Sequence, residues 1–207
     1  IRDHCVTGVQ TCALPISMDH PHIIKIRGWS SKGIAAYENG RHDSFFLVLD
    51  VLDETLDQRM GRWGRCNSGE LGTEKMRIIS EVASGLAYIH GRNVIYRDLK
   101  PRNVGFHKDS VKIFDFGLSR ELSQYKTITG RVGTARYMSP EVIDGDTKPY
   151  DMSSDVYSWA ILSWEIMAEE KPFEGLSRDQ HADLVCSPKN VRPSLSNTNI
   201  DRKSTRL

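Results

Sequence analysis

The chain has 207 residues, of which 39% are hydrophobic and 27% charged, proportions that are ordinary for a soluble globular protein of one domain or two small ones. Its formal net charge of only +1 argues against nucleic acid or an anionic membrane as the main partner, and no apolar run is long enough to form a membrane segment. The four cysteines lack CxxC spacing, which indicates neither a disulfide framework nor a zinc site and favours an intracellular, cytoplasmic location.

The two ends of the chain are related at the level of codons. Residues 201–207, DRKSTRL, can be encoded by DNA whose reverse complement encodes QTCALPI, the sequence of residues 10–16. Two unrelated termini have no physical reason to be antisense copies of each other. We therefore interpret residues 1–16 and 201–207 as translated sequencing-adapter DNA, and we expect the rest to be an internal fragment of a longer protein.

The first structured region predicts strands and then a helix. Residues 20–30, HPHIIKIRGWS, contain a turn followed by an apolar strand candidate, and residues 44–52, SFFLVLDVL, are a run of aromatic and branched residues typical of a strand. The polar, glycine-containing stretch 61–72 predicts a loop. Apolar residues then recur at steps of three and four, which predicts an amphipathic helix over 74–90.

The second half of the chain alternates between short strands, loops and one apolar helix. Short strands are predicted at 94–96 and 111–114. Residues 117–140 lack sustained periodicity and contain Gly, Ser and Thr, which predicts a long functional loop. Residues 153–170 are helical in pattern with apolar residues on almost every face, so we expect this helix to be buried.

Three motifs in this half carry the functional information. They are YRDLKPRN at 96–103, DFG at 115–117 and SPE at 139–141. In order and spacing the set resembles the catalytic loop, the metal-binding loop and the end of the activation segment of eukaryotic protein kinases. One of these strings alone would mean little, but the three together are specific. The resemblance extends over residues 17–200.

The resemblance implies an α+β, protein-kinase-like fold of two lobes. Residues 17–52 would be the end of the small lobe and the hinge, and residues 53–200 most of the mainly helical large lobe, truncated at its C-terminus. No Gly-rich loop and no VAIK-type lysine precede the hinge, so we expect the fragment as written to be inactive or nearly so.

The resemblance also implies a reaction, the transfer of the ATP γ-phosphate to a hydroxyl group. Asp98 would orient the substrate hydroxyl and accept its proton, and Lys100 would place a cation beside the transferring phosphate. Asn103 and Asp115 would supply hard oxygen ligands to Mg²⁺. The alternative makes Asp98 and Asn103 turn residues and Asp115 a solvated strand end, and for any one of them alone this alternative would be favoured. The register of all three favours the catalytic interpretation.

The protein substrate is expected to offer serine or threonine. Lys100 and Thr134, in DLKPRN and GTARYMSPE, resemble the residues of serine/threonine kinases, whereas tyrosine kinases usually differ at both places. The resemblance also implies two structural roles. Asp155 would brace the backbone of the catalytic loop, and Glu141 would form a buried ion pair with Arg192.

The nucleotide base is expected at the end of the 44–52 strand. By resemblance, Leu49 would be the gatekeeper, backbone groups of Asp50 and Leu52 would hydrogen-bond adenine, and Asp53 or Glu54 would meet the ribose.

Three positions depart from the usual pattern of the family. Gly105 stands where a bulky residue commonly forms the floor under adenine. Tyr96 replaces the commoner histidine, and Ser139 replaces the alanine of the APE motif.

Arg97 suggests regulation, because kinases with this arginine pair it with a phosphate on the activation segment. The candidate acceptors for an activating kinase are Ser123, Tyr125, Thr127 and Thr129, of which we favour Thr127 or Thr129. The alternative is that these are only exposed loop hydroxyls.

Two other functions compete with an active parent kinase. A pseudokinase or scaffold would bind partners without transferring phosphate, but the intact Asp98, Asn103 and Asp115 argue against it. A genuinely short binding module would expose the apolar surface that a complete small lobe covers, which makes it the least favoured interpretation.

Overall fold

The computed structural model describes residues 18–29, 47–63, 71–122, 127–145, 147–188 and 190–195. The helices of this part are α3 (Leu56–Trp63), α4 (Leu71–His90), α5 (Pro140–Ile143), α6 (Ser153–Ala168) and α7 (Arg178–Cys186), with 3-10 turns η2 (Pro101–Asn103), η3 (Phe116–Leu118) and η4 (Ala135–Tyr137). The strands are β1 (Ile26–Trp29), β2 (Leu47–Leu49), β3 (Glu54–Thr55), β4 (Val94–Ile95), β5 (Val104–His107), β6 (Ser110–Ile113) and β7 (Arg120–Glu121). No helix in these ranges is long and apolar enough to span a membrane.

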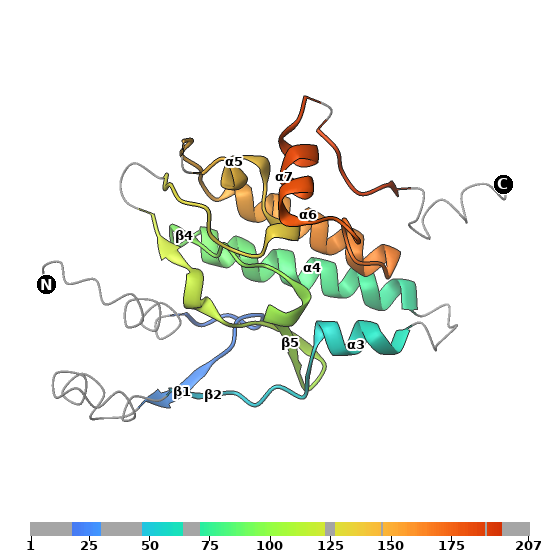
Figure 1. Cartoon of the computed structure of the whole chain (residues 1–207). Coiled ribbons are helices and arrows are strands. Elements are labelled where there is room, and N and C mark those ends of the chain that lie inside the picture. Colours follow the sequence, from blue (N-terminus) through green and yellow to red (C-terminus); the bar gives the residue numbers. More distant parts are fainter. Residues whose placement is uncertain are drawn as a thin grey trace, which may run out of the picture.

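The strands form three small antiparallel sheets around a helical body. β1 pairs with β2, β4 pairs with β7, and the largest sheet has the order β3-β5-β6. Figure 1 shows the long helices α4 and α6 side by side, with the β1–β2 pair set apart from them. The polar segment that contains Asp98 lies between β4 and β5, and its ends are therefore fixed by two different sheets.

The helix predictions are confirmed with shifted boundaries. The helix expected over 74–90 begins three residues earlier, at Leu71, and the one expected over 153–170 ends at Ala168. The loop predicted for 61–72 is wrong at both ends, because α3 continues to Trp63 and α4 already begins at Leu71. The intervening residues 64–70 lie outside the described part of the chain.

Helix α3 was missed although its start has a sequence signal. The Thr55 backbone N–H donates to Gln58 Oε1 (2.8 Å), and the Gln58 backbone N–H donates to Thr55 Oγ1 (3.3 Å). This reciprocal pair is a capping box, and T-x-x-Q is its pattern. The same pattern, Ser177 with Gln180, begins α7.

Strand β5 was also missed, and with it the hairpin that follows the polar segment. The predicted strands at 94–96 and 111–114 are confirmed as β4 and β6, but β5 pairs with β6 through the turn residues Lys108 and Asp109. Both turn residues have positive φ (49° and 66°), as a two-residue type I′ hairpin turn requires. Asn-Gly is the usual signal for that turn, and Lys-Asp does not give it.

The predicted strand at 44–52 is shorter than expected. Only Leu47–Leu49 is a strand, and residues 44–46 lie outside the described ranges. The long loop expected over 117–140 holds, in its described part, the two-residue strand β7, the short turns η3 and η4, and the first residue of α5.

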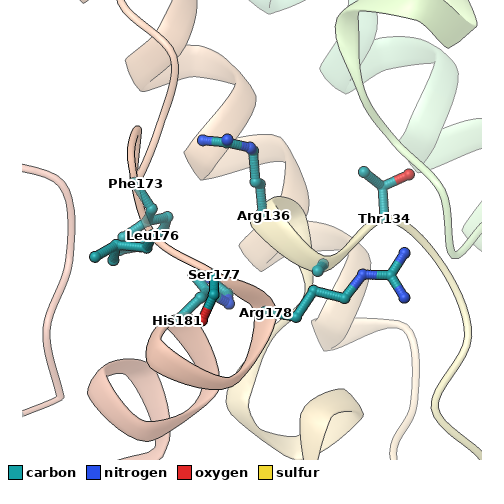
Figure 2. Close-up of a pocket in the computed structure, with 8 residues that line it drawn as sticks. Thr134, Arg136, Phe173, Leu176, Ser177, Arg178 and His181 are labelled. Atoms are coloured by element: carbon teal, nitrogen blue, oxygen red, sulfur yellow. The ribbon is translucent and has the colours of Figure 1, made fainter.

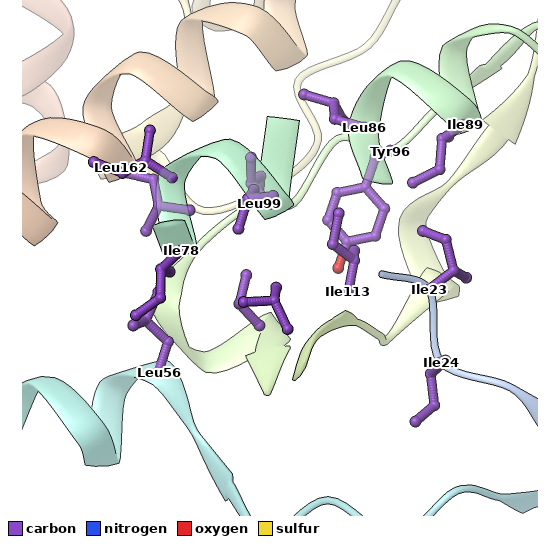
Figure 3. Close-up of a cluster of buried hydrophobic side chains, with 14 of the residues drawn as sticks. Ile23, Ile24, Leu56, Ile78, Leu86, Ile89, Tyr96, Leu99, Ile113 and Leu162 are labelled. Carbon is purple, nitrogen blue, oxygen red and sulfur yellow. The ribbon is translucent and has the colours of Figure 1, made fainter. Parts of the chain in front are cut away.

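The main hydrophobic core lies between α4, α6 and the β3-β5-β6 sheet. Figure 3 shows side chains from α4, from the segment after β4 and from β6 converging on it, among them Ile78, Tyr96 and Ile113. A second core joins α5 and α7 to Ile95 of β4. Helix α6 borders both cores, since Leu162 packs in the first and Tyr157 against the second, which explains why its apolar residues occupy almost every face.

His181 is buried beside the second core without a hydrogen bond. Its side chain is 3% exposed, it contacts the Phe173 ring edge-on at 4.5 Å, and neither ring nitrogen has a partner. Burial lowers the pKa of this imidazole from about 6.5, and the charges of Arg136, Arg131 and Arg192 lower it further.

This lowered pKa predicts a loss of stability in mild acid. Because the unfolded chain binds the proton more readily than the folded one, the contribution of His181 is complete above about pH 6.5 and is lost as the pH falls. We expect His181→Phe to reduce the decline in Tm between pH 7.5 and pH 5, measured by circular dichroism. Part of the decline would persist, since burial also lowers the pKa of His20. An unchanged pH dependence would contradict the prediction.

Candidate active site

Three side chains donate hydrogen bonds to the Asp98 carboxylate. Asp98 is 7% exposed, and it accepts hydrogen bonds from Lys100 Nζ (2.6 Å), Thr134 Oγ1 (2.6 Å) and Asn103 Nδ2 (3.0 Å). Lys100 Nζ also donates to Thr134 Oγ1 (3.0 Å). The structure thus brings together Asp98, Lys100 and Asn103, as the sequence predicts, with both carboxylate oxygens held by donors.

Thr134 is a site residue whose contact the sequence did not predict. From the sequence, Thr134 is expected only to indicate a serine or threonine acceptor. Its hydroxyl donates directly to Asp98, which lies 36 positions earlier in the chain. No local sequence pattern predicts a contact between residues so far apart in the chain. The contact depends on how the 117–140 segment folds back over the polar loop.

Asp155 braces the segment that contains Asp98, as predicted. This carboxylate is fully buried at the start of α6 and accepts the backbone N–H groups of Tyr96 (2.7 Å) and Arg97 (2.8 Å). His90 Nε2 lies 2.9 Å from the same carboxylate. Arg97 has φ of +72°, a conformation that costs energy for a non-glycine residue, and these hydrogen bonds stabilise it.

Tyr96 joins this segment to the DFG loop. Its hydroxyl donates to the Phe114 carbonyl, its ring lies edge-on to Phe116 (5.3 Å), and its own carbonyl accepts from Ser119 Oγ (3.2 Å). Burial raises the pKa of the Tyr96 phenol well above its ordinary value, and the charges of Asp115, Asp98 and Asp155 raise it further. The position where histidine is commoner is therefore occupied by a buried phenol whose hydroxyl group donates to a backbone carbonyl.

Asp115 presents a carboxylate to solvent at the beginning of the DFG loop. It is exposed, has φ of +58°, and accepts the Gly117 backbone N–H (3.3 Å) as the cap of η3. Asn103 uses its amide nitrogen on Asp98, which leaves its side-chain carbonyl oxygen for a ligand. A carboxylate and an amide oxygen are hard donors that fit Mg²⁺. No group of three or more His, Cys, Asp or Glu side chains in the described ranges could hold a metal by itself.

Gly133 allows the loop to approach the Asp98 segment. It has φ of +122°, and a Cβ atom at this position would lie far inside van der Waals contact with the Arg97 carbonyl oxygen. Only glycine satisfies both constraints, and the next residue is Thr134, which contacts Asp98. The position of the Thr134 hydroxyl therefore depends on this close approach.

We expect Gly133→Ala to lower the free energy of unfolding by about 2–4 kcal/mol, the combined cost of backbone strain and a steric clash. The matched control is Gly130→Ala, because Gly130 also has positive φ (101°) but has open space around its Cβ position. Urea unfolding of both variants separates the clash from the strain. Equal losses would show that the contact with Arg97 does not matter.

The predicted adenine-binding segment lies at the end of β2. Leu49 is 41% exposed, and the backbone N–H of Asp50 donates to the Lys25 carbonyl (3.0 Å). Among the described residues, none donates a hydrogen bond to the Asp50 carbonyl. Within the described ranges, the backbone of Leu52 has no hydrogen-bond partner. The Asp50 side chain pairs with Arg27, which lowers the pKa of that carboxyl group.

Leu52 explains the glycine at position 105. A Cβ atom on Gly105 would lie 2.8 Å from Leu52 Cδ1 and 3.2 Å from the Glu54 carbonyl oxygen. The space that a bulky residue would fill is therefore taken by Leu52. The Glu54 carboxylate pairs with Arg59 (2.9 Å) and Arg62 (2.5 Å) on α3, and Asp53 accepts a backbone N–H of the β5–β6 turn.

The ion pair predicted between Glu141 and Arg192 is wrong for this structure, in which both residues are described. The Arg192 guanidinium lies over the Tyr157 ring at 4.9 Å, and its Nη1 donates to the neighbouring Val191 carbonyl (2.8 Å). The Arg192 guanidinium group therefore contacts the Tyr157 ring and a backbone carbonyl, and not the carboxylate of Glu141.

The predicted phosphate acceptors lie partly in the described chain. Thr127 and Thr129 are both exposed and flank Ile128, whose backbone exchanges hydrogen bonds with Tyr150 (2.9 and 2.8 Å). Ser123 and Tyr125 lie outside the described residues.

Comparison with known proteins identifies the family to which this chain is similar. Residues 10–205 match the family model described as the protein kinase domain. The serine/threonine-protein kinase STY46 of Arabidopsis thaliana is 36% identical over 128 residues, which cover 58% of this chain and 22% of STY46. The serine/threonine/tyrosine-protein kinase HT1 of the same plant is 39% identical over 121 residues, covering 58% of this chain and 30% of HT1. This chain thus spans a third or less of such relatives.

Two further matches extend over more of the chain. A probable serine/threonine-protein kinase of Dictyostelium discoideum is 35% identical over 180 residues, covering 86% of this chain and 13% of that protein. Among solved structures, the yeast RNA Pol II CTD kinase CTDK-1 complex aligns with a TM-score of 0.72 at 22% identity, covering 86% of this chain and 55% of the matched chain. The structural match shows the fold alone.

Proposed function

Because this chain belongs to the protein kinase domain family, we propose that it is part of a serine/threonine kinase that transfers the γ-phosphate of ATP to hydroxyl groups of protein substrates. Proteins of the family use ATP and a divalent metal. The observation that carries the proposal is the Asp98 carboxylate, which accepts hydrogen bonds from Lys100, Asn103 and Thr134. Such positioning is the main contribution that a protein makes to phosphoryl transfer.

Each site residue has a proposed role in the transfer. Asp98 orients the substrate hydroxyl and accepts its proton, while Lys100 places its ammonium group beside the transferring phosphate. Asn103, through its carbonyl oxygen, and Asp115, through its carboxylate, are the residues that would hold Mg²⁺. When bound, the metal ion neutralises charge on the nucleotide phosphates. Thr134 holds the acceptor oxygen of Asp98 in place.

The nucleotide base is proposed to lie between Leu49, Gly105 and the backbone of Asp50 and Leu52. This placement is supported by the Asp50 carbonyl and the Leu52 backbone groups, which have no hydrogen-bond partner in the part of the chain that the structure describes. Glu54 is proposed to contact the ribose, although its carboxylate is also shared with two arginines of α3.

Activation is proposed to require phosphorylation of Thr127 or Thr129 by another kinase, with Arg97 as the partner of the phosphate. The exposure of both threonines supports access for such an enzyme. The Arg97 side chain already reaches the loop, since its Nε donates to the Leu118 carbonyl (2.5 Å).

The function is tested by phosphotransfer from radiolabelled ATP to a general serine- and threonine-containing protein. Both the 207-residue chain and the product of the complete reading frame that encodes it are assayed. We expect the protein encoded by the complete reading frame to form phosphoserine or phosphothreonine on the substrate. Asp115→Asn in that protein, or chelation of Mg²⁺, should abolish the transfer. The 207-residue chain should transfer phosphate slowly. The exposed loop variant Asp109→Asn is the matched control. Transfer that survives both treatments, or only phosphotyrosine, would contradict the proposal.

A further inference from the structure

A pocket of about 230 Å³ opens between η4 and the start of α7. Figure 2 shows Thr134 and Arg178 on one side of it, with Phe173 and His181 on the other, and Arg136 is among its lining residues. This volume is below the range of roughly 300–1,000 Å³ that is usual for small-molecule sites. A pocket of this size suits a single side chain of a larger ligand.

The pocket adjoins the residue that we propose to accept the substrate proton. Thr134 lines the pocket and also donates its hydrogen bond to Asp98. An extended peptide advances by about 3.3–3.6 Å per residue. When the acceptor hydroxyl of a peptide lies at Asp98, a residue only a few positions from the acceptor can therefore place its side chain in the pocket.

The charge of the lining is positive. In the described part of the chain, neither Arg136 nor Arg178 has a carboxylate in ion-pair distance, and the only hydrogen bond of the Arg136 side chain goes to the Pro172 carbonyl (2.7 Å). The nearby acids Glu174 and Asp179 are exposed and do not line the pocket. The N-terminus of α7, capped by Ser177, adds its partial positive charge.

His181 is the second observation that indicates a ligand. It lines the pocket, it is 3% exposed, and both of its ring nitrogens lack a hydrogen-bond partner. Buried polar groups are nearly always satisfied in folded proteins. The charged groups that act on this ring are the arginines Arg136, Arg131 and Arg192.

We propose that this pocket binds an anionic side chain of the peptide substrate, a carboxylate or a phosphate, and thereby selects acceptor sites with an acidic residue close to the serine or threonine. The proposal rests on the proposed kinase function and deepens it. Arg178 is the specificity-determining residue, because its exposed guanidinium group can bind a carboxylate or phosphate through two parallel hydrogen bonds.

The test measures peptide binding to the 207-residue chain by fluorescence anisotropy, without nucleotide. The probes are fluorescein-labelled peptides with one central serine among alanines, and versions in which aspartate or phosphoserine is moved through each of four positions on either side. We expect aspartate at one position to tighten binding roughly tenfold, as a charge-assisted contact allows, with phosphoserine showing whether phosphate binds better than carboxylate.

Variants locate the effect in the pocket. Arg178→Glu is expected to remove the preference for the acidic peptide, and Arg178→Lys to retain most of it. The matched control is Arg92→Glu, which makes the same charge change at an exposed arginine in the turn after α4, and it should keep the preference. Circular dichroism confirms that each variant is folded.

Three results would overturn the proposal: equal binding of acidic and neutral peptides, an acidic preference that persists in Arg178→Glu, or no peptide binding at millimolar concentration. None of these three binding results bears on the proposed kinase function, because the phosphotransfer assay measures product formation and does not depend on sequence preference. Conversely, an acidic preference with no phosphotransfer would contradict the kinase function and leave the pocket assignment intact.

Discussion

Replacing Asp155 with alanine is expected to lower the free energy of unfolding by about 3–5 kcal/mol, the largest stability effect among the residues near the site. The carboxylate is fully buried and accepts two backbone N–H groups, from Tyr96 and Arg97, and it also contacts His90. Alanine would leave these donors buried without an acceptor. It would also release Arg97 from its left-handed conformation, and the Asp98 segment would lose its fixed shape.

The measurement is urea unfolding followed by circular dichroism. The matched control is Asp151→Ala, because Asp151 is an exposed aspartate in the same region, and within the described ranges its carboxylate accepts hydrogen bonds from Ser153 alone, whose backbone N–H lies 2.8 Å away. Loss of these exposed hydrogen bonds should cost about 1 kcal/mol. If both variants lost the same small amount, the buried hydrogen bonds of Asp155 would not stabilise the loop as proposed.

The second large effect concerns catalysis. Asp98→Asn, made in the product of the complete reading frame, is expected to slow phosphotransfer by about 10²–10⁴-fold, because the amide cannot accept the proton of the substrate hydroxyl. The new NH₂ group would also face donors, since Lys100, Thr134 and Asn103 all donate to this side chain.

Nucleotide binding separates the chemical step from a general loss of structure. Titration with a fluorescent ATP analogue should give a similar Kd for the wild type and Asp98→Asn, whereas kcat falls. Asp109→Asn, in the exposed β5–β6 turn, should change neither quantity substantially. A variant at Asp98 that retained its full kcat would refute the proposed role.

The sequence predicted those features that are local. Asp98, Lys100 and Asn103 lie within six residues of each other, so their clustering follows from a single loop. The helix over 74–90 follows from its apolar periodicity. The resemblance supplied the longer-range brace from Asp155, which residue patterns alone would not have given.

The features that were missed depend on geometry between distant segments or on unusual turn residues. The contact of Thr134 with Asp98 requires Gly133 to pass close to Arg97, which no local pattern encodes. The Lys108–Asp109 turn lacks the usual glycine, and ion pairs of Asp109 with Arg59 (2.6 Å) and Arg77 (3.2 Å) support it from outside the hairpin. The capping box of α3 was a readable signal that the loop prediction overlooked.

Helix α6 borders both hydrophobic cores and also carries Asp155 at its first turn. Loss of either core would remove one wall of the other, so we expect the described region to melt in a single cooperative transition. The segment that contains Asp98 is also bound to this helix, through the hydrogen bonds of Asp155. We therefore expect that the site does not unfold separately from the rest of the region. The catalytic geometry should persist until global melting.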